Sequence, residues 1–237
     1  MSERIKGTYK IADKIISVDS IYRNVHNYCQ GYEASGDPEI VVKTSAEDIL
    51  FEKERAEEEH SDGYLEELAV YRHICEKMPF YNTFMFHGSC IAVDGIGYLF
   101  GAPSGTGKST HAKIWCDNLG DRAVMVNDDK PLLKVENGTI YAYGTPYNGK
   151  HRRGTNMRAP LKAICFLHQA PDNSIRPLEK AEAYTNIITQ TYRPFDMEAF
   201  VKTMELVDVM LESLKFYSLG CNMEREAFEV SFGAMNK

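Results

Sequence analysis

The sequence lacks an excess of positive charge, paired cysteines and long apolar runs. It carries 34 acidic and 27 basic side chains, which gives a formal net charge of −7. Proteins that coat nucleic acid need many Lys and Arg side chains to neutralise phosphates. We therefore expect no nucleic acid partner, although a local basic cluster could still bind one small anion.

The six cysteines are scattered, and none of them stands in a CxxC pair. This spacing favours neither a zinc site nor a disulfide framework, so we expect reduced and mostly buried thiols. No window reaches the roughly 18 apolar residues of a membrane span, and no apolar stretch typical of a signal peptide follows the N-terminus. The expected location is the cytoplasm, with no membrane partner.

The composition, with 43% hydrophobic and 26% charged residues in 237, is that of an ordinary globular protein. A chain of this length can bury a full core without a disulfide or a structural metal. We expect a single domain over residues 1–237. In it, an N-terminal strand and helix region of about 1–80 would pack on a larger core of about 81–237.

The hydrophobic pattern predicts an α/β fold. Apolar residues recur at helical intervals over 63–78 until Pro79, and Asp94-Gly95 predicts a tight turn between the apolar runs 83–93 and 97–100. Further helices are expected over 108–119, 181–190, 197–215 and from about 224. Further strands are expected over 8–18, 39–42, 123–126, 132–135, 139–143, 162–167 and 216–219.

The segment Ala102-Pro103-Ser104-Gly105-Thr106-Gly107-Lys108-Ser109 fits the P-loop pattern [AG]-x4-G-K-[ST]. Its two glycines let the backbone curl so that successive N–H groups point inward, and Lys108 adds a positive point charge. The following helix directs the partial positive charge of its N-terminus at the phosphates. The sequence thus predicts ATP and Mg²⁺ as cofactors, with Ser109 on the metal. The expected phosphate-binding residues are Ser104, Gly105, Thr106, Gly107, Lys108, Ser109 and Thr110.

Two adjacent carboxylates follow the expected strand 123–126, in Asn127-Asp128-Asp129-Lys130-Pro131. Asn, Asp and Pro are turn residues, so a simple turn explains the segment when it is taken alone. Downstream of a P-loop, however, phosphoryl transfer needs a carboxylate near the metal and often another that accepts the proton of the acceptor hydroxyl. The pair can divide these two roles.

Three segments together resemble a known family. Phe86-His87-Gly88-Ser89, the stretch 98–110 and Val126-Asn127-Asp128-Asp129 are similar, in identity and spacing, to the catalytic domain of HPr kinase/phosphorylase. They resemble more distantly the nucleotide site of ATP-dependent phosphoenolpyruvate carboxykinase. The resemblance covers about residues 80–170 and implies a mixed β-sheet with a P-loop. It also implies that His87 and Asp129 form a catalytic pair, that Asp128 lies on the magnesium side, and that the chain forms a homo-oligomer.

The Gly-rich segment 143–156 carries the basic residues Lys150, Arg152 and Arg153. An exposed basic loop would explain the pattern. In an acidic protein with a P-loop we favour a mobile lid, whose cations close on phosphates or on an acidic acceptor and help to exclude water.

These features predict an ATP-dependent kinase that transfers the γ-phosphoryl group to a hydroxyl, with a serine of a protein or peptide as the expected acceptor. Lys108 would neutralise the phosphates, Ser109 and Asp128 would hold Mg²⁺, and Asp129 would act as the base with support from His87. Two alternatives stay open: a small-molecule kinase, and a non-catalytic protein that senses ATP to control a partner. The paired carboxylates favour the enzyme, because a sensor needs only one carboxylate beside the metal.

Overall fold

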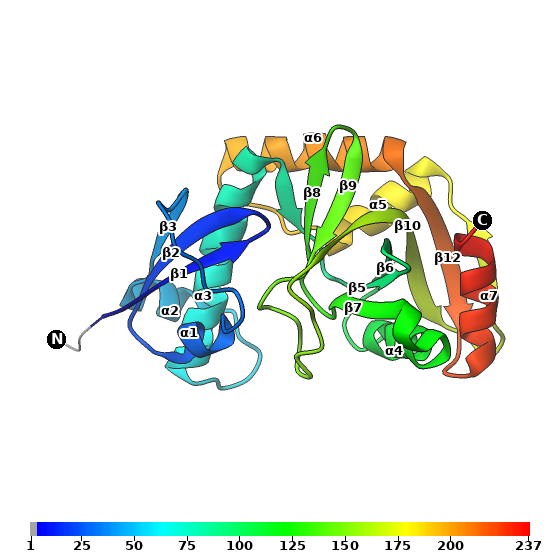
Figure 1. Ribbon diagram of the computed structural model, residues 1–237, viewed down its shortest axis with the longest axis horizontal. Coiled ribbons are helices and arrows are strands. Elements are labelled where there is room, and N and C mark those ends of the chain that lie inside the picture. The colour runs from blue at the N-terminus through cyan, green and yellow to red at the C-terminus, as the bar shows by residue number, and fades with distance from the viewer. Residues whose placement is uncertain (1–3) are drawn as a thin grey trace.

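The computed structural model describes residues 4–237, and its N-terminal part contains a small sheet of three strands. In this sheet β1 (Ile5–Ile11) and β2 (Lys14–Ser20) are antiparallel, and β3 (Ile40–Lys43) lies parallel to β2. The helices beside it are α1 (Asn24–Tyr28), α2 (Ala46–Lys53) and α3 (Asp62–Lys77). We call residues 4–81 the N-terminal unit; it occupies the left of Figure 1.

The first hairpin corrects a prediction, because the sequence pattern predicts one strand over 8–18. The structure instead turns at Ala12 and Asp13, whose φ angles are 47° and 64°. Two successive residues with positive φ match the twist of a tight hairpin, but the usual Asn-Gly or Gly-Gly pair is absent here. The Asp13 carboxylate accepts a hydrogen bond from the hydroxyl of Tyr143. The turn is therefore stabilised by a contact that lies 130 residues away in the chain.

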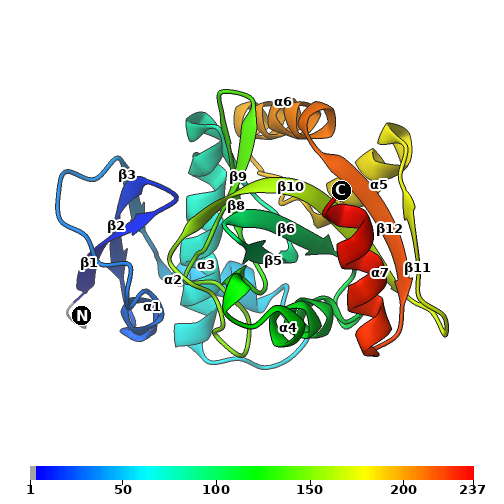
Figure 2. The same cartoon turned by 45° about the vertical axis from the view of Figure 1, so that its right-hand side comes forward.

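The remaining strands form one mixed sheet in the order β4-β8-β9-β10-β6-β5-β7, with β12 on β10 and β11 on β12. Strand β10 joins its two parts. Its first residues, 158–160, pair antiparallel with β9, and after an irregularity at Leu161 its later residues pair in parallel with β6 and β12. Figure 2 shows β10 arching across the molecule. The strands are β4 (Thr83–Met85), β5 (Gly88–Val93), β6 (Ile96–Gly101), β7 (Ala123–Asn127), β8 (Leu132–Glu136), β9 (Thr139–Tyr143), β10 (Arg158–Gln169), β11 (Ser174–Pro177) and β12 (Lys215–Cys221).

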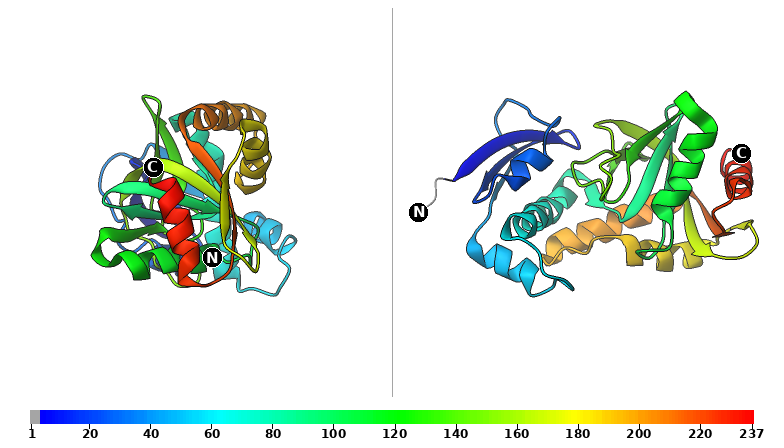
Figure 3. Two further views of the ribbon diagram at one scale, coloured as in Figure 1. Left: turned by 90° about the vertical axis from the view of Figure 1, so that its right-hand side faces the viewer. Right: turned by 90° about the horizontal axis from the view of Figure 1, so that it is seen from below.

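Helices cover both faces of this sheet, so the fold is a mixed α/β fold, as the sequence predicts. On one face α5 (Lys180–Gln190) and α6 (Met197–Ser213) pack against Leu99, Ile164 and their neighbours. On the other face α4 (Lys108–Leu119) and α7 (Arg225–Met235) enclose Trp115. Figure 3 shows the sheet between these two helical layers.

Most of the expected elements are confirmed, and their bounds shift by a few residues. The helices over 63–78 and 108–119 are α3 and α4, and the Asp94-Gly95 turn joins β5 to β6. The run 83–93 is two strands, however: β4 pairs with β8, whereas β5 pairs with β6 and β7. Within residues 4–237 no helix is both long enough and apolar enough to cross a bilayer.

The N-terminal unit and the sheet share one apolar cluster. Ile16, Val42 and Ile74 of the unit pack in the same cluster as Leu132 and Tyr147. Figures 1 and 3 show α3 between the small sheet and the large one. This packing brings α1 and α3 beside the turn that follows β7.

His111, on α4, is expected from its place in the sequence to be a packing or surface residue, and the structure buries it. Its Nε2 atom lies 3.2 Å from Trp115 Nε1 and 3.1 Å from Ser231 Oγ. Its Nδ1 atom has no hydrogen-bond partner within residues 4–237. Burial lowers the pKa of His111 to about 4.

His111 should therefore make folding sensitive to acid. The folded-state pKa lies below the ordinary value of 6.5, so the unfolded chain binds this proton first as the pH falls. The stabilisation is complete above about pH 6.5 and is lost as the pH falls towards 4. We expect the stability advantage of the wild type over His111→Gln to shrink by about 3 kcal/mol between pH 7 and pH 4. Urea unfolding at each pH measures this; an equal pH dependence in both proteins would contradict it.

Candidate functional site

The loop 102–107 leaves the end of β6 and enters α4 at Lys108. Gly105 and Gly107 have φ angles of 78° and 116°, which side-chain-bearing residues rarely adopt. Gly107 is the N-cap residue, and no side chain of the described chain caps α4. The first N–H groups of the helix therefore point outward without a capping acceptor, which is the usual arrangement of an anion-binding helix N-terminus.

Lys108 lies under this loop and is only 7% exposed. Its Nζ atom donates to the carbonyl oxygens of Ala102 at 2.8 Å and of Pro103 at 3.2 Å. Burial lowers the pKa of Lys108, against the opposing effects of Asp129 and Asp128. The ammonium group thus supports the curled backbone next to the N-terminus of α4, which has no side-chain cap.

A network of hydrogen bonds fixes the turn after β7. The Asn127 side-chain oxygen accepts from the backbone N–H groups of Asp129 at 2.9 Å and of Lys130 at 2.8 Å. The Asn127 amide donates to Thr145 Oγ1 at 3.0 Å, and that hydroxyl donates to the Lys130 carbonyl at 3.0 Å. Tyr71 of α3 donates to the same carbonyl at 2.7 Å. The two carboxylates of the turn are therefore held on a rigid support.

Asp128 is the more buried of the two carboxylates, at 5% exposure. Ser89 of β5 donates to its Oδ1 atom at 2.9 Å. Burial raises the pKa of Asp128, whereas the hydroxyls of Ser89 and Ser109 and the charge of Arg153 lower it. Asp128 and Ser109 thus bring two oxygen atoms together at the start of α4.

Asp129 lies beside His87, with 3.5 Å between Oδ1 and Nε2, and about a third of each side chain is exposed. The backbone holds the pair: the His87 N–H donates to the Gln190 carbonyl at 2.7 Å, and Gly88 donates to the Asp129 carbonyl at 2.9 Å. Burial and the charge of Lys108 lower the pKa of His87, and Asp129 opposes them. A neutral imidazole at pH 7 can accept a proton or orient the carboxylate.

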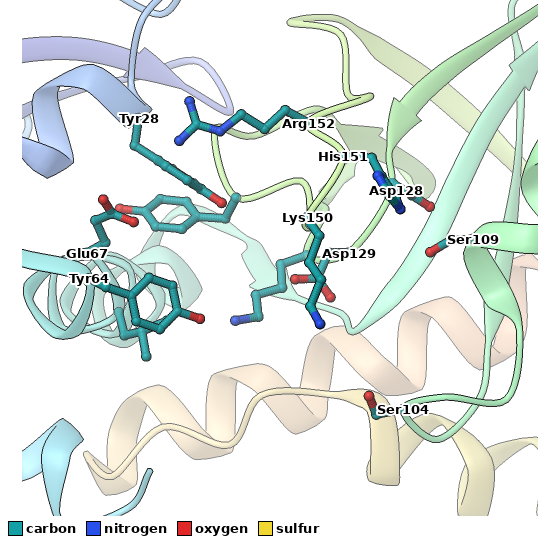
Figure 4. Close-up of a pocket in the computed structure, with 14 residues that line it drawn as sticks. Tyr28, Tyr64, Glu67, Ser104, Ser109, Asp128, Asp129, Lys150, His151 and Arg152 are labelled. Carbon is teal, nitrogen blue, oxygen red and sulfur yellow. The ribbon is translucent and has the colours of Figure 1, made fainter. Parts of the chain in front are cut away.

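A cavity of about 570 Å³ unites several of these groups. Figure 4 shows labelled side chains that line it. The sheet side supplies Ser104, Ser109, Asp128, Asp129 and Lys130. The loop between β9 and β10 adds residues 149–152, and the N-terminal unit adds Tyr28, Tyr64, Glu67 and Leu68. The cavity therefore has a wall from each part of the chain.

The expected lid residues take different positions. Lys150 and Arg152 line the cavity. Arg153 does not line it, but its charge lowers the pKa of Asp128. The Arg152 guanidinium lies 4.3 Å from the centre of the Tyr28 ring. Figure 4 shows it reaching towards the N-terminal unit, away from Ser104 and Ser109.

A second cavity of about 550 Å³ lies on the other side of the glycine loop. Gly105, Thr106, Gly107 and Thr110 form one wall. The other residues come from the C-terminal ends of β10 and β12 and the segments after them, together with His111 and Ile114 of α4. The loop is thus a partition between two cavities, and its residues divide between them.

Several functional contacts are absent from the sequence-based site. Ser89 and Asn127 stand inside the motifs that suggested the family, but only the structure shows that they hold Asp128 and the turn. Tyr28, Tyr64 and Glu67 lie outside those motifs. The sequence contains no local signal for them, because their place at the cavity depends on how α1 and α3 pack against the sheet.

The protein offers few ligands for a metal ion. Across the part of the chain that the structure describes, no three His, Cys, Asp or Glu side chains are placed to hold one. Mg²⁺ typically takes one or two carboxylates and completes its shell with substrate phosphates and water. Asp128 and Ser109 fit that pattern and could hold Mg²⁺ together with a bound phosphate.

Comparison with known proteins adds a family. The model of the family described as SynChlorMet cassette protein ScmC matches residues 58–209, from just before α3 into α6. The chain belongs to the ScmC family. The matched segment of this ScmC-family chain contains the glycine loop, both aspartates and the basic loop, whereas Tyr28 lies before it.

No curated protein matches the chain. Among solved structures, the HPr(Ser) kinase/phosphatase from Coxiella burnetii is similar to it at 11% sequence identity with a TM-score of 0.38. That similarity covers 64% of this chain and 94% of the other.

Proposed function

We propose that this ScmC-family chain is an ATP-dependent phosphotransferase that transfers the γ-phosphoryl group to a hydroxyl of a protein or peptide. One observation carries the proposal: Ser104 and Ser109 of the glycine loop face the same cavity as Asp128 and Asp129. Phosphoryl transfer needs a phosphate cradle, a carboxylate on the metal side and a proton acceptor close together.

The phosphates of ATP would lie against the loop N–H groups and the start of α4, with Lys108 beneath them. The second cavity suits the nucleoside, because it touches the loop from outside and is bordered by Ile114 and Met223. This arrangement directs the γ-phosphoryl group towards Ser109 and the first cavity. Lys150 and Arg152, which line the first cavity, would close on it through a movement of the basic loop.

Asp128 and Ser109 would hold Mg²⁺, which neutralises charge on the phosphates during transfer. Asp129 is the proposed base. It accepts the proton of the acceptor hydroxyl as that oxygen bonds to the γ-phosphorus, while the bond from the γ-phosphorus to the bridging oxygen breaks and ADP leaves. His87 would orient Asp129 from 3.5 Å.

The different surroundings of the two aspartates support an enzyme over an ATP sensor. Asp128 is buried and receives a serine hydroxyl, whereas about a third of Asp129 is exposed, next to an imidazole. A binding protein needs a group like Asp128, but a pair like Asp129 and His87 adds nothing to the affinity for a nucleotide. A homo-oligomer and the absence of a nucleic acid partner stay predictions from the sequence.

Incubation with γ-labelled ATP and a library of serine-containing peptides tests the function. We expect ADP release and phosphopeptides, identified by mass spectrometry. Tight ATP binding without transfer to any member of the library or to a proteome extract would instead favour the sensor and contradict the phosphotransferase.

The nucleoside position makes a separate prediction. Ile114 is partly exposed and lines the second cavity, so Ile114→Trp should fill the space proposed for the base. We expect about a tenfold loss of ATP affinity, which is about 1.4 kcal/mol of binding free energy, with tripolyphosphate affinity nearly unchanged. Asn118→Trp, on the same helix but outside that cavity, is the control. Equal losses for ATP and tripolyphosphate would show that the base lies elsewhere. Calorimetric titration with both ligands measures the difference.

A further inference from the structure

The cavity wall that the N-terminal unit supplies has no part in the chemistry described above. It consists of Tyr28 from α1 and of Tyr64, Glu67 and Leu68 from α3. Figure 4 shows Tyr28, Tyr64 and Glu67 on the side of the cavity opposite Ser104 and Ser109. A substrate that spans the cavity from the phosphates would meet this wall at its far end.

Glu67 is the only acidic side chain of the wall, and it is 7% exposed. Burial raises the pKa of its carboxyl, against the effects of Arg152 and Asn24. Among residues 4–237, no ion pair within 4.0 Å includes Glu67. Its neighbour Glu66 is different, because it accepts hydrogen bonds from the backbone N–H groups of Ile21 and Tyr22, both at 2.7 Å. Glu66 is bound to the backbone, whereas the Glu67 carboxyl lies at the cavity, where Arg152 and a hydrogen bond from Asn24 lower its pKa against burial.

Arg152 shows what this wall attracts. Its guanidinium lies over the Tyr28 ring at 4.3 Å, and its charge lowers the pKa of Glu67. A cation over an aromatic face and near a carboxylate is a favourable arrangement. In this position Arg152 has a φ of 48°, a backbone conformation that is costly for a residue with a side chain. The same residue is a candidate to close on the phosphates, and that movement would leave the place on Tyr28 free for another cation.

Charged side chains of both signs line the cavity. Lys150 and Lys130 line it together with the two aspartates, and bound phosphates would complement those cations. Glu67 is left to the opposite wall. Asp129 nevertheless raises the pKa of both Tyr28 and Tyr64, so the wall lies within electrostatic range of the proposed base. A group bound here would share the cavity with Asp129 and with the hydroxyl from which it takes the proton.

We propose that Glu67, with the rings of Tyr28 and Tyr64, binds an Arg or Lys side chain of the acceptor peptide near the phosphorylated hydroxyl. The inference rests on the proposed function for its account of the acceptor. The N-terminal unit is then the part of the chain that selects the acceptor, and the large sheet is the part that carries the chemistry.

Fluorescent heptapeptides test this inference. All have a central serine, and the residues on either side of it are Arg, Gln or Glu. Anisotropy in the presence of Mg²⁺ and a non-hydrolysable ATP analogue gives their affinities without any transfer step. We expect the wild type to bind the Arg peptide about tenfold or more tightly than the Gln peptide, as for a hydrogen bond to a buried charge. Glu67→Gln should reduce this preference to about twofold, and Tyr28→Leu should reduce it about threefold.

Glu59→Gln is the matched control, because it removes the same charge from an exposed loop of the N-terminal unit. It should keep the full preference, and all variants should keep the affinity for ATP. Equal binding of Arg and Gln peptides to the wild type would overturn the inference. So would a Glu67→Gln protein that binds every peptide more tightly, since Glu67 would then serve only to hold Arg152.

The results that would contradict the phosphotransferase proposal differ from those that would contradict the peptide site. An Arg preference that depends on Glu67, in a protein that transfers no phosphate, would leave the peptide site standing and remove the reaction. Conversely, transfer with no preference for basic peptides would leave the reaction standing and remove the site.

Discussion

Lys108→Ala is expected to lower the rate of phosphoryl transfer by about 10²- to 10³-fold, the usual effect of removing one group that stabilises transition-state charge. The ammonium group is hydrogen-bonded to the carbonyls of the glycine loop, and the charges of Asp129 and Asp128 act on its pKa. Its hydrogen bonds to the Ala102 and Pro103 carbonyls also hold the loop in its curled shape. Both effects should weaken ATP binding. Titration with ATP and single-turnover assays measure the two losses separately.

Lys113→Ala is the control for this change. Lys113 is on the same helix, and its ammonium pairs with Asp117 at the exposed surface. Loss of that pair should leave ATP affinity and transfer nearly unchanged, since exposed ion pairs contribute about 0–1 kcal/mol. If Lys108→Ala retains wild-type affinity and activity while remaining folded, the glycine loop does not bind phosphate.

The glycine loop could be predicted from the sequence because its geometry is local. Two glycines with positive φ, a lysine and a helix start are all encoded within eight consecutive residues. The helices α3 and α4 could be predicted for a similar reason: one is periodic up to a proline, and the other ends at Gly120. In each case neighbouring residues determine the structure.

Two parts of the fold depend on contacts between distant residues and cannot be predicted from neighbouring residues. The turn at Ala12 and Asp13 lacks the usual hairpin residues and is supported by Tyr143. Strand β10 changes partners along its length, from β9 to β6 and β12, at the irregularity beside Leu161. Only the second half of β10 has the sequence pattern of a buried strand, so the predicted strand over 162–167 does not include its first residues.

The candidate site divides in the same way. The His87 and Asp129 side chains lie 3.5 Å apart, and their role as a catalytic pair, implied by the family resemblance, stays a prediction. The cavity wall formed by α1 and α3 follows instead from the apolar cluster that Ile74 of α3 shares with Leu132 and Tyr147. No motif contains that information, because the residues that meet there come from three distant segments.

Asp129→Asn should separate chemistry from nucleotide binding. Asparagine keeps the shape of the side chain but cannot take the proton of the acceptor hydroxyl, so we expect transfer to fall by about 10²- to 10⁴-fold. ATP affinity should change by less than about twofold, because Asp128, and not Asp129, lies with Ser109 on the proposed metal side.

The same substitution has a second consequence that a general loss of structure would not produce. The Asp129 carboxylate raises the pKa of His87, against burial and Lys108. Its removal should therefore lower the pKa of His87, and NMR titration of the imidazole measures that shift. Asp117→Asn, which removes an exposed carboxylate from α4, should change neither transfer nor the His87 titration. Transfer at the wild-type rate in Asp129→Asn would exclude Asp129 as the base. A parallel loss of ATP affinity would place it on the metal side, the role proposed for Asp128.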